Sequence, residues 1–216
     1  MKLTRLARLL LCSILITMIA TTAWADVRLP QVIGSQMVLQ REMAVPIWGW
    51  ADPGEKVTVT LGDCKVEATA CEKGKWAVKL AAMKAGGPHS ITVAGKNTIT
   101  LEDILVGEVW VCSGQSNMQW SVQASNNAKE EIAAANYPEM RLFTVARKVA
   151  EKPLDDCQGS WAACTPETVP AFTAVGYFFG RALHKEVGVP IGLINSSWGG
   201  TIAEAWTSHE GLLGED

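Results

Sequence analysis

The chain has 216 residues, of which 48% are hydrophobic and 19% are charged. This length is sufficient for one large domain or two small ones, each with its own core, and the ordinary composition excludes a disordered or low-complexity protein. The formal net charge is −3 and the sequence has no basic cluster, which argues against nucleic acid as a partner.

The first 25 residues have the three parts of a secretory signal peptide. A basic lead with Lys2, Arg5 and Arg8 precedes the apolar run Leu9 to Thr22, and Ala23-Trp24-Ala25 has the small-x-small pattern of a signal-peptidase site. The run is shorter than the roughly 20 residues of a membrane span, so an uncleaved anchor is the less favoured alternative. We expect cleavage after Ala25, export to the periplasm or the extracellular medium, and no stable membrane anchor. Cleavage leaves 16 basic and 22 acidic residues, a formal charge of −6.

From residue 26 to about residue 106 the sequence predicts an all-β domain. Apolar residues alternate with polar ones in short segments, which is the period of a half-buried strand. The predicted strands cover residues 45–50, 57–61, 65–70, 76–80, 91–93 and 99–101. Turn residues separate them, and Gly86-Gly87-Pro88 is expected to break the chain before Ile91. Short strands at regular spacing are typical of a small antiparallel β-sandwich.

After Gly107 the pattern changes to strands that alternate with helices. Strands are predicted at 109–112, 140–145 and 191–194, and helices at 127–136 and 172–187, the second of which ends at Gly188. This alternation favours a parallel α/β sheet, so residues 107–216 are assigned to a second domain. Three strands are fewer than the five or six of a usual sheet, and we therefore expect the chain to be truncated.

The predicted mature chain has five cysteines, an odd number that leaves at least one thiol unpaired in an exported protein. Cys157 and Cys164 flank a loop-like stretch and could close a small ring. Cys64 and Cys71 lie at opposite ends of one predicted strand, where a direct bond would be strained. Cys112 lies in an apolar strand and is expected to be a buried free thiol. No CxxC occurs and the histidines are scattered, so a zinc site has little support.

Ser116 follows the predicted strand 109–112 in the stretch VWVCSGQSNMQW. One interpretation is structural, because Ser116 to Gln119 has the S-x-x-Q form of a capping box. The other is catalytic. A serine between a buried strand and a helix stands at the carboxyl edge of the sheet, where open α/β folds bind ligands, and the helix N-terminus offers N–H groups to an oxyanion. Met118 replaces the last glycine of the G-x-S-x-G elbow, so the stretch does not match α/β-hydrolases.

A second polar, glycine-rich turn follows the predicted strand 191–194. It reads NSSWGGT and covers residues 195–201. Thr201 to Glu204 has the T-x-x-E form of a capping box. The paired glycines Gly199 and Gly200 are more than a cap requires, and they would let backbone N–H groups approach a substrate oxygen closely.

The stretch GQSNM at 114–118, together with SWGGT at 197–201 and EAW at 204–206, resembles the sialate O-acetylesterase family of SGNH hydrolases. The resemblance covers nearly all of the mature chain, because the segments 36–41, 45–59, 74–76 and 103–110 match as well. It implies a flavodoxin-like three-layer α/β/α catalytic domain, preceded by a β-sandwich. It also implies an acetylated sugar or glycan as substrate and no metal or organic cofactor; the oligomeric state stays open.

The resemblance assigns roles to residues of both turns. Ser116 would attack the acetyl carbonyl of O-acetylated sialic acid or a related sugar, giving an acetyl-enzyme that water hydrolyses. The N–H of Ser116 and that of Gly199 or Gly200, with Gly200 preferred, would hold the oxyanion. The candidate substrate-binding residues are Gln115, Asn117, Trp198 and Glu204.

The sequence departs from the family at the catalytic base. The family's base is a histidine in a D-x-x-H-like motif near the C-terminus, and a middle motif completes the oxyanion hole; neither motif is present here. His89 lies in a predicted turn, His184 in the helix 172–187 and His209 after Trp206, and none has an aspartate three residues before it. Because a serine without a base is a weak nucleophile, we expect the histidine to lie beyond the end of this chain and the chain itself to be nearly inactive.

Two other functions remain open. Trp48, Trp50 and Trp76 could stack on sugars, which would make the chain a secreted, non-catalytic carbohydrate-binding protein, although core packing is the preferred interpretation of these side chains. The second is an acetylxylan esterase, since related SGNH families share the GQSN and GGT stretches.

Overall fold

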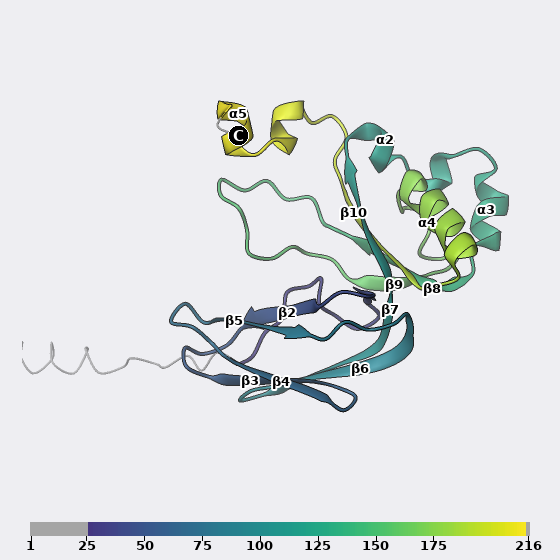
Figure 1. The fold of residues 1–216 in the computed structure, drawn as a ribbon. Helices are drawn as coiled ribbons and strands as arrows, with labels where there is room; N and C mark the ends of the chain where they lie inside the picture. The colour runs from purple at the N-terminus through teal and green to yellow at the C-terminus, as the bar shows by residue number, and fades with distance from the viewer. Residues whose placement is uncertain (1–25, 215–216) are drawn as a thin grey trace, which may run out of the picture.

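The computed structural model describes residues 26–214, so the predicted signal peptide lies outside the described residues. The fold is mixed α/β and is dominated by one large sheet. Figure 1 shows a β-rich part, in which strands β1 to β6 lie, and a second part with the helices beside the sheet. Within residues 26–214, no helix is long and apolar enough to cross a membrane.

Three strands predicted for the first part form within one residue of the expected bounds: β2 (Val45–Trp50), β3 (Lys56–Leu61) and β5 (Lys75–Leu80); β4 (Cys64–Thr69) is shifted by one residue. β1 (Val38–Gln40) was not predicted, and β6 (Gly86–Ala94) is longer than the strand expected at 91–93. β2 and β5 form an antiparallel pair of their own, whereas β4, β3 and β6 continue the large sheet in that order. The expected break at Gly86-Gly87-Pro88 is wrong, because these residues begin β6, and His89 therefore lies in a strand rather than in a turn.

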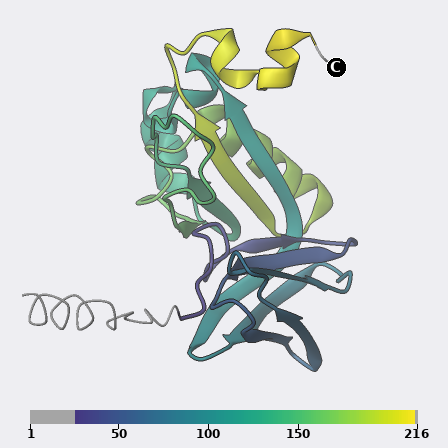
Figure 2. The ribbon, with the colours of Figure 1, turned by 90° about the vertical axis from the view of Figure 1, so that its left-hand side faces the viewer.

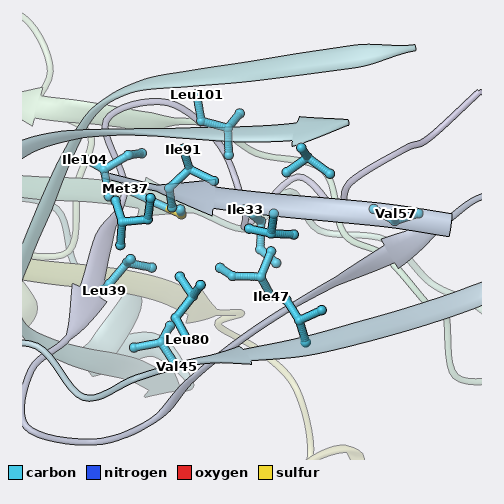
Figure 3. Packing of buried hydrophobic residues seen from close by; sticks show 14 of the residues in the cluster. Ile33, Met37, Leu39, Val45, Ile47, Val57, Leu80, Ile91, Leu101 and Ile104 are labelled. Carbon is cyan, nitrogen blue, oxygen red and sulfur yellow. The ribbon is translucent and has the colours of Figure 1, made fainter. Parts of the chain in front are cut away.

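A shared apolar core lies between the β2–β5 pair and the sheet that contains β3 and β6. The alternating residues of β3 and β2 bury one face each, and their side chains meet those of β5 and β6. Figure 3 shows Ile47, Leu80, Ile91 and Ile104 pointing into this core, and all four are at most 1% exposed. Burying one such side chain stabilises the fold by about 1.5–3 kcal/mol, so the period-2 pattern alone accounts for the facing sheets.

β7 (Thr98–Gly114) is one strand of 17 residues that runs through both parts of the chain. It pairs antiparallel with β6 in its first half, parallel with β1 around Leu105–Gly107, and parallel with β10 (Ile191–Ser197) over its last seven residues. The separate strands expected at 99–101 and 109–112 are therefore one element. The expected domain boundary after residue 106 falls within this strand.

The second part contains the predicted parallel strands. β10 lies between β7 and β8 (Tyr137–Thr144) and is parallel to both, which confirms the parallel α/β arrangement. β9 (Trp161–Cys164) pairs antiparallel with the outer edge of β8. The sequence did not predict β9, because four residues flanked by polar loop-like sequence carry too little periodicity.

Helices cover one face of these strands (Figure 1). They are the short turns α2 (Ser116–Gln119) and η1 (Val122–Ala124), the helix α3 (Ala128–Ala134) and the longer helix α4 (Ala174–Val187). The Thr173 hydroxyl caps α4 by accepting the Gly176 N–H, and Gly188 ends the helix with φ of 63°, as the sequence predicts. Tyr177 of α4 donates a 2.6 Å hydrogen bond to Glu131 of α3, which links the two helices.

A buried arginine joins β8 to the middle of β7. Arg141 is 5% exposed, and its Nη1 and Nη2 atoms donate to the two Asp103 carboxylate oxygens at 2.7 and 2.9 Å. This hydrogen bonding lowers the pKa of the Asp103 carboxyl below its usual value. Asp103 has a φ of 56°, a left-handed conformation that aspartate and asparagine tolerate better than most residues.

All cysteines of the described residues are free thiols. The ring that Cys157 and Cys164 could close is not formed in this structure: Cys164 is buried in β9, and Cys157 is half-buried in the preceding loop. The prediction of a buried free thiol at Cys112 is confirmed. Burial disfavours a thiolate and raises the pKa of Cys112 to about 11 and that of Cys164 to about 12.

Candidate active site

The two glycine-containing turns follow neighbouring parallel strands. In the register between β7 and β10, Ser197 lies opposite Gly114, so both strands end at the same level of the sheet. Figure 2 shows this end beneath the last turns of the chain, η2 (Ala203–Trp206) and α5 (His209–Leu213). Open α/β sheets bind ligands at the carboxyl ends of their parallel strands. This edge of the sheet is therefore the candidate binding site.

Three hydrogen bonds tie the two turns to each other. They run from the Trp198 N–H to the Gly114 carbonyl (3.0 Å), from the Gln115 side-chain amide to the Thr201 carbonyl (2.5 Å), and from the Gly199 N–H to the Gln119 side-chain oxygen. Each turn thus supplies donors and acceptors to the other. Because such bonds fix the relative position of the two loops, the site does not depend on the sheet register alone.

Gly199 lies directly against Ser116. A Cβ atom added at position 199 would lie 3.2 Å from Ser116 Oγ, 3.3 Å from Ser116 Cα and 2.8 Å from Gln119 Oε1. Any side chain at this position would push on the serine hydroxyl or on the glutamine. The glycine in SWGGT is therefore explained by the close approach of the second turn to the serine.

Ser116 is not the cap of its helix. It is the first residue of α2, the cap position belongs to Gln115, and no side-chain capping hydrogen bond is made, so the capping-box interpretation of Ser116 is wrong. The Ser116 side chain is exposed, and within residues 26–214 its hydroxyl has no hydrogen-bond partner. Since α2 has only four residues, the macrodipole expected to help at its N-terminus is small.

The two glycine N–H groups differ in availability. The Gly199 N–H is engaged by Gln119 Oε1, whereas the Gly200 N–H donates to no atom of the described residues. Gly200 has a φ of +78°, a left-handed conformation that glycine adopts readily. Of the two candidate oxyanion donors, Gly200 is the one whose N–H remains free.

For the remaining predicted site residues, no side-chain hydrogen bond to Ser116 is formed within residues 26–214. Asn117 is exposed beside it on α2, and Gln115 is engaged with Thr201. Trp198 is half-buried, and Glu204 is exposed in η2. The capping box expected at Thr201 is wrong, because the cap of η2 is Ile202 and makes no side-chain bond.

The three histidines lie on three different elements. His89 lies in β6. The Nδ1 of His184 lies 2.8 Å from the Val189 carbonyl at the end of α4. His209 is the first residue of α5, whose cap is the Ser208 hydroxyl. Among the histidines that the structure describes, none forms a hydrogen bond with Ser116.

A cavity of about 470 Å³ opens beside the second turn. Its walls come from the segment that follows β8, and from the end of β10 with the segment that follows it. The lining residues that carry polar or aromatic groups are Arg147, Lys148, Ser196, Ser197, Trp198, Thr201 and Trp206. Arg147 and Lys148 were missed by sequence reasoning. The sequence did contain a clue to these two residues: they follow β8, the third parallel strand, and so lie at the same carboxyl edge of the sheet as the two turns. No group of three or more metal-ligating side chains occurs in residues 26–214.

Comparison with known proteins identifies related enzymes. Residues 106–215 match the family described as carbohydrate esterase, sialic acid-specific acetylesterase. The chain is 39% identical over 216 residues to the sialate O-acetylesterase of Homo sapiens, covering 88% of this chain and 41% of that protein. It is 37% identical over 222 residues to the enzyme of Mus musculus, covering 92% of this chain and 41% of that protein.

A solved structure shares the fold. The crystal structure of a carbohydrate acetylesterase from Xanthomonas citri superposes with a TM-score of 0.83 at 38% sequence identity, covering 88% of this chain and 44% of that one. This chain therefore spans about two fifths of the length of the curated relatives that it matches.

Proposed function

The chain belongs to the carbohydrate esterase family of sialic acid-specific acetylesterases, and from this premise we propose that the protein removes O-acetyl groups from sialic acid or a related acetylated sugar, with Ser116 as the nucleophile. One observation supports the serine above the others: the contact between Ser116 and Gly199 brings the two glycine-containing turns together at the carboxyl edge of the sheet. A structural helix cap would not need the second turn to lie against it.

In the proposed reaction, Ser116 Oγ attacks the acetyl carbonyl carbon while a base takes its proton. The carbonyl oxygen becomes an oxyanion, which the N–H groups of Ser116 and Gly200 stabilise; Gly199 could join only if its bond to Gln119 opened. The bond to the sugar oxygen then breaks, the sugar leaves with a proton, and an acetyl-enzyme remains. Water hydrolyses this ester to release acetate and restores the serine.

We place substrate contacts on Asn117, which follows the serine, on Trp198 of the second turn, and on the exposed Glu204 of η2. Gln115 is engaged with the Thr201 carbonyl, so its proposed part is to hold the second turn in position while its exposed side reaches the substrate. The family resemblance implies no metal and no organic cofactor for this chemistry.

We place the catalytic histidine beyond residue 216. Three observations support this proposal. The described histidines form no hydrogen bond with Ser116, the chain spans about two fifths of its relatives, and among residues 26–214 the last part of β7, residues 108–114, pairs with β10 alone. Val111 and Trp110, on this end of β7, are 65% and 44% exposed, which suits a sheet that continues with further chain.

The finer architecture belongs to the same proposal. The two facing sheets of residues 26–106 support a β-sandwich, and the helices α3 and α4 supply one helical layer of an α/β/α domain in residues 107–216. Export after cleavage behind Ala25 fits a secreted glycan as substrate. A mature N-terminus at Asp26, read by mass spectrometry, would support it.

The decisive experiment measures acetate release from 9-O-acetyl-N-acetylneuraminic acid by the complete protein, that is, this chain with any residues encoded after Asp216. Ser116→Ala should lower the rate by at least about 10³-fold, since removing the nucleophile leaves only residual catalysis. Ser113→Ala, an exposed serine at the end of the same strand, is the matched control and should keep the rate. An active Ser116→Ala variant would refute the nucleophile.

The two alternatives have their own tests. Comparing rates on acetylated sialic acid and acetylated xylan separates the proposed activity from an acetylxylan esterase. A non-catalytic sugar-binding role has one structural observation in its favour: Trp48 and Trp50 lie edge to face at 5.7 Å beside a cavity of about 340 Å³. Trp76, also at this cavity, is only 4% exposed and packs in the core. Glycan binding that survives Ser116→Ala, without hydrolysis by any longer chain, would favour this role.

A further inference from the structure

The cavity beside the second turn carries positive charge. Arg147 and Lys148 are its two charged lining residues, and no aspartate or glutamate lines it. Neither cation forms an ion pair with a carboxylate of residues 26–214. The chain as a whole is negative, so two uncompensated cations in one hollow are a local exception.

Arg147 is held in place by the protein. Its Nε donates to the Ser197 carbonyl at 3.3 Å, one residue before Trp198. The guanidinium still has N–H donors on its Nη atoms, and a planar guanidinium binds a carboxylate through two parallel hydrogen bonds. The hydrogen bond to Ser197 therefore orients the Arg147 guanidinium, whose remaining N–H groups can bind a carboxylate.

The opposite wall of the cavity is aromatic and ordered by hydrogen bonds. The Trp206 Nε1–H donates to the Thr201 hydroxyl at 2.7 Å, and this hydroxyl donates to the Trp198 carbonyl at 2.8 Å. Trp198 and Trp206 both line the cavity. Indole rings offer apolar faces to the C–H groups and the N-acetyl methyl group of a sugar, so one hollow combines an anion receptor with a surface suited to a sugar ring.

The cavity lies next to the proposed nucleophile rather than on it. Ser116 does not line the cavity, but Trp198 and Thr201 do, and both belong to the turn whose Gly199 touches Ser116. In a sialic acid, the carboxylate stands on the anomeric carbon C2, and the glycerol side chain, whose last carbon carries the 9-O-acetyl group, stands on C6, the other carbon bonded to the ring oxygen. A substrate with its ester at Ser116 must therefore place its carboxylate at a neighbouring site.

We propose that this cavity is the carboxylate subsite of the enzyme, in which Arg147, assisted by Lys148, binds the carboxylate of an acidic sugar while Trp198 and Trp206 contact its ring. The inference rests on the proposed function, because it names the part of the site that would select acidic over neutral acetylated sugars. It adds two residues that a search for a serine esterase would not consider.

Binding to this chain tests the proposal without any need for catalysis. The probes are the methyl α-glycoside of N-acetylneuraminic acid and the methyl ester of the same glycoside, which is isosteric near the ring but uncharged. Isothermal titration calorimetry should give at least tenfold tighter binding of the acid. Arg147→Gln should bring the acid to the affinity of the ester, Arg147→Lys should give an intermediate value, and Lys148→Gln a smaller loss.

Lys129→Gln is the matched control, because Lys129 is an exposed cation on α3 outside the cavity; it should leave both affinities unchanged. Equal affinity for acid and ester, or no binding of the acid at millimolar concentration, would overturn the proposal with wild-type protein alone. Ser116→Ala separates this outcome from the proposed function. This variant should bind the acid as the wild type does. If acid and ester bind equally well while Ser116→Ala abolishes hydrolysis by the complete protein, the subsite proposal fails and the proposed nucleophile stands.

Discussion

The side-chain oxygen of Gln119 accepts a hydrogen bond from the Gly199 N–H, across the gap between the turn that follows β7 and the turn that follows β10. This bond satisfies one backbone donor of the second turn and keeps Gly199 against Ser116. The protein thus uses a helix residue of the first turn to hold the backbone of the second.

Replacing this amide should loosen the site. Gln119→Leu keeps the approximate size of the side chain but leaves the Gly199 N–H without its acceptor, so we expect a loss of about 0.5–1.5 kcal/mol in the free energy of unfolding. Urea denaturation followed by circular dichroism measures it. Gln123→Leu, at an exposed glutamine of η1, is the control, and equal stability of the two variants would contradict the importance of the bond.

Gly199→Ala should destabilise the fold more than the addition of one methyl group usually does. The added Cβ would lie 2.8 Å from Gln119 Oε1 and 3.2 Å from Ser116 Oγ, and a clash of this kind costs about 1–3 kcal/mol. Gly34→Ala is the matched substitution, because a Cβ there meets nothing closer than 3.6 Å. Thermal unfolding of both variants compares them, and a Gly199→Ala protein as stable as Gly34→Ala would show that the turns have room to separate.

The Arg141–Asp103 pair should make stability depend on pH in the acid range. Because the folded pKa of Asp103 is lowered by Arg141, the stabilisation is complete above the unfolded-state pKa of about 3.9 and is lost as the pH falls through the folded pKa. Because the Asp103 side chain is 43% exposed and solvent screens the pair, Asp103→Asn should cost about 1–2 kcal/mol at pH 7, less than the full value of a charged hydrogen bond, and progressively less below pH 4. Asparagine tolerates the left-handed backbone of this position, so the variant removes mainly the charge.

Urea unfolding of wild type and Asp103→Asn at pH 7 and pH 3 provides the measurement. Asp155→Asn breaks the exposed ion pair with Lys75, whose side chains are 68% and 52% exposed, and should cost at most about 1 kcal/mol. A difference between wild type and Asp103→Asn that stays constant from pH 7 to pH 3 would disprove the assignment.

The thiols should differ in reactivity. Cys64 and Cys71 are exposed, and backbone hydrogen bonds, first that of Lys75, lower the pKa of Cys71, so iodoacetamide should label Cys71 fastest in the folded protein. Cys112 and Cys164, buried and with raised pKa values, should react only after denaturation. Mass spectrometry of labelled peptides reads both, and a Cys157–Cys164 disulfide in the peptide map would contradict the structure.

Much of the β-rich part followed from the sequence, because its strands have one buried and one solvent-facing side. Val57 and Val59 mark the buried face of β3 directly. The full length of β7 could not be predicted from the sequence, because its strand partners change along its length. It alternates near Leu101, is buried on both faces from Ile104 to Gly107, and is exposed again at Val111, so a single period cannot describe it.

The site was predictable only in part. The stretch GQSNM pointed to Ser116, but its S-x-x-Q pattern equally suits a helix cap. The two interpretations are separated by the cap position, which belongs to Gln115, and by the approach of Gly199, 83 positions later in the sequence. Which glycine keeps a free N–H depends on the Gln119 side chain, which no local pattern reveals. Arg147 becomes visible only when the end of β8 is placed beside the end of β10.

The unbroken course of β7 has a mechanical consequence. The same backbone that forms the wall of the apolar core at Ile104 ends at Gly114, two residues before the serine, with no linker between them. The β-rich part is therefore rigidly coupled to the edge of the sheet that carries Ser116, since a rotation of this part would turn the strand that leads to the serine. The loops around this strand could be lengthened without that effect, but a one-residue insertion within the strand would reverse the faces of its side chains and displace Ser116, the proposed nucleophile.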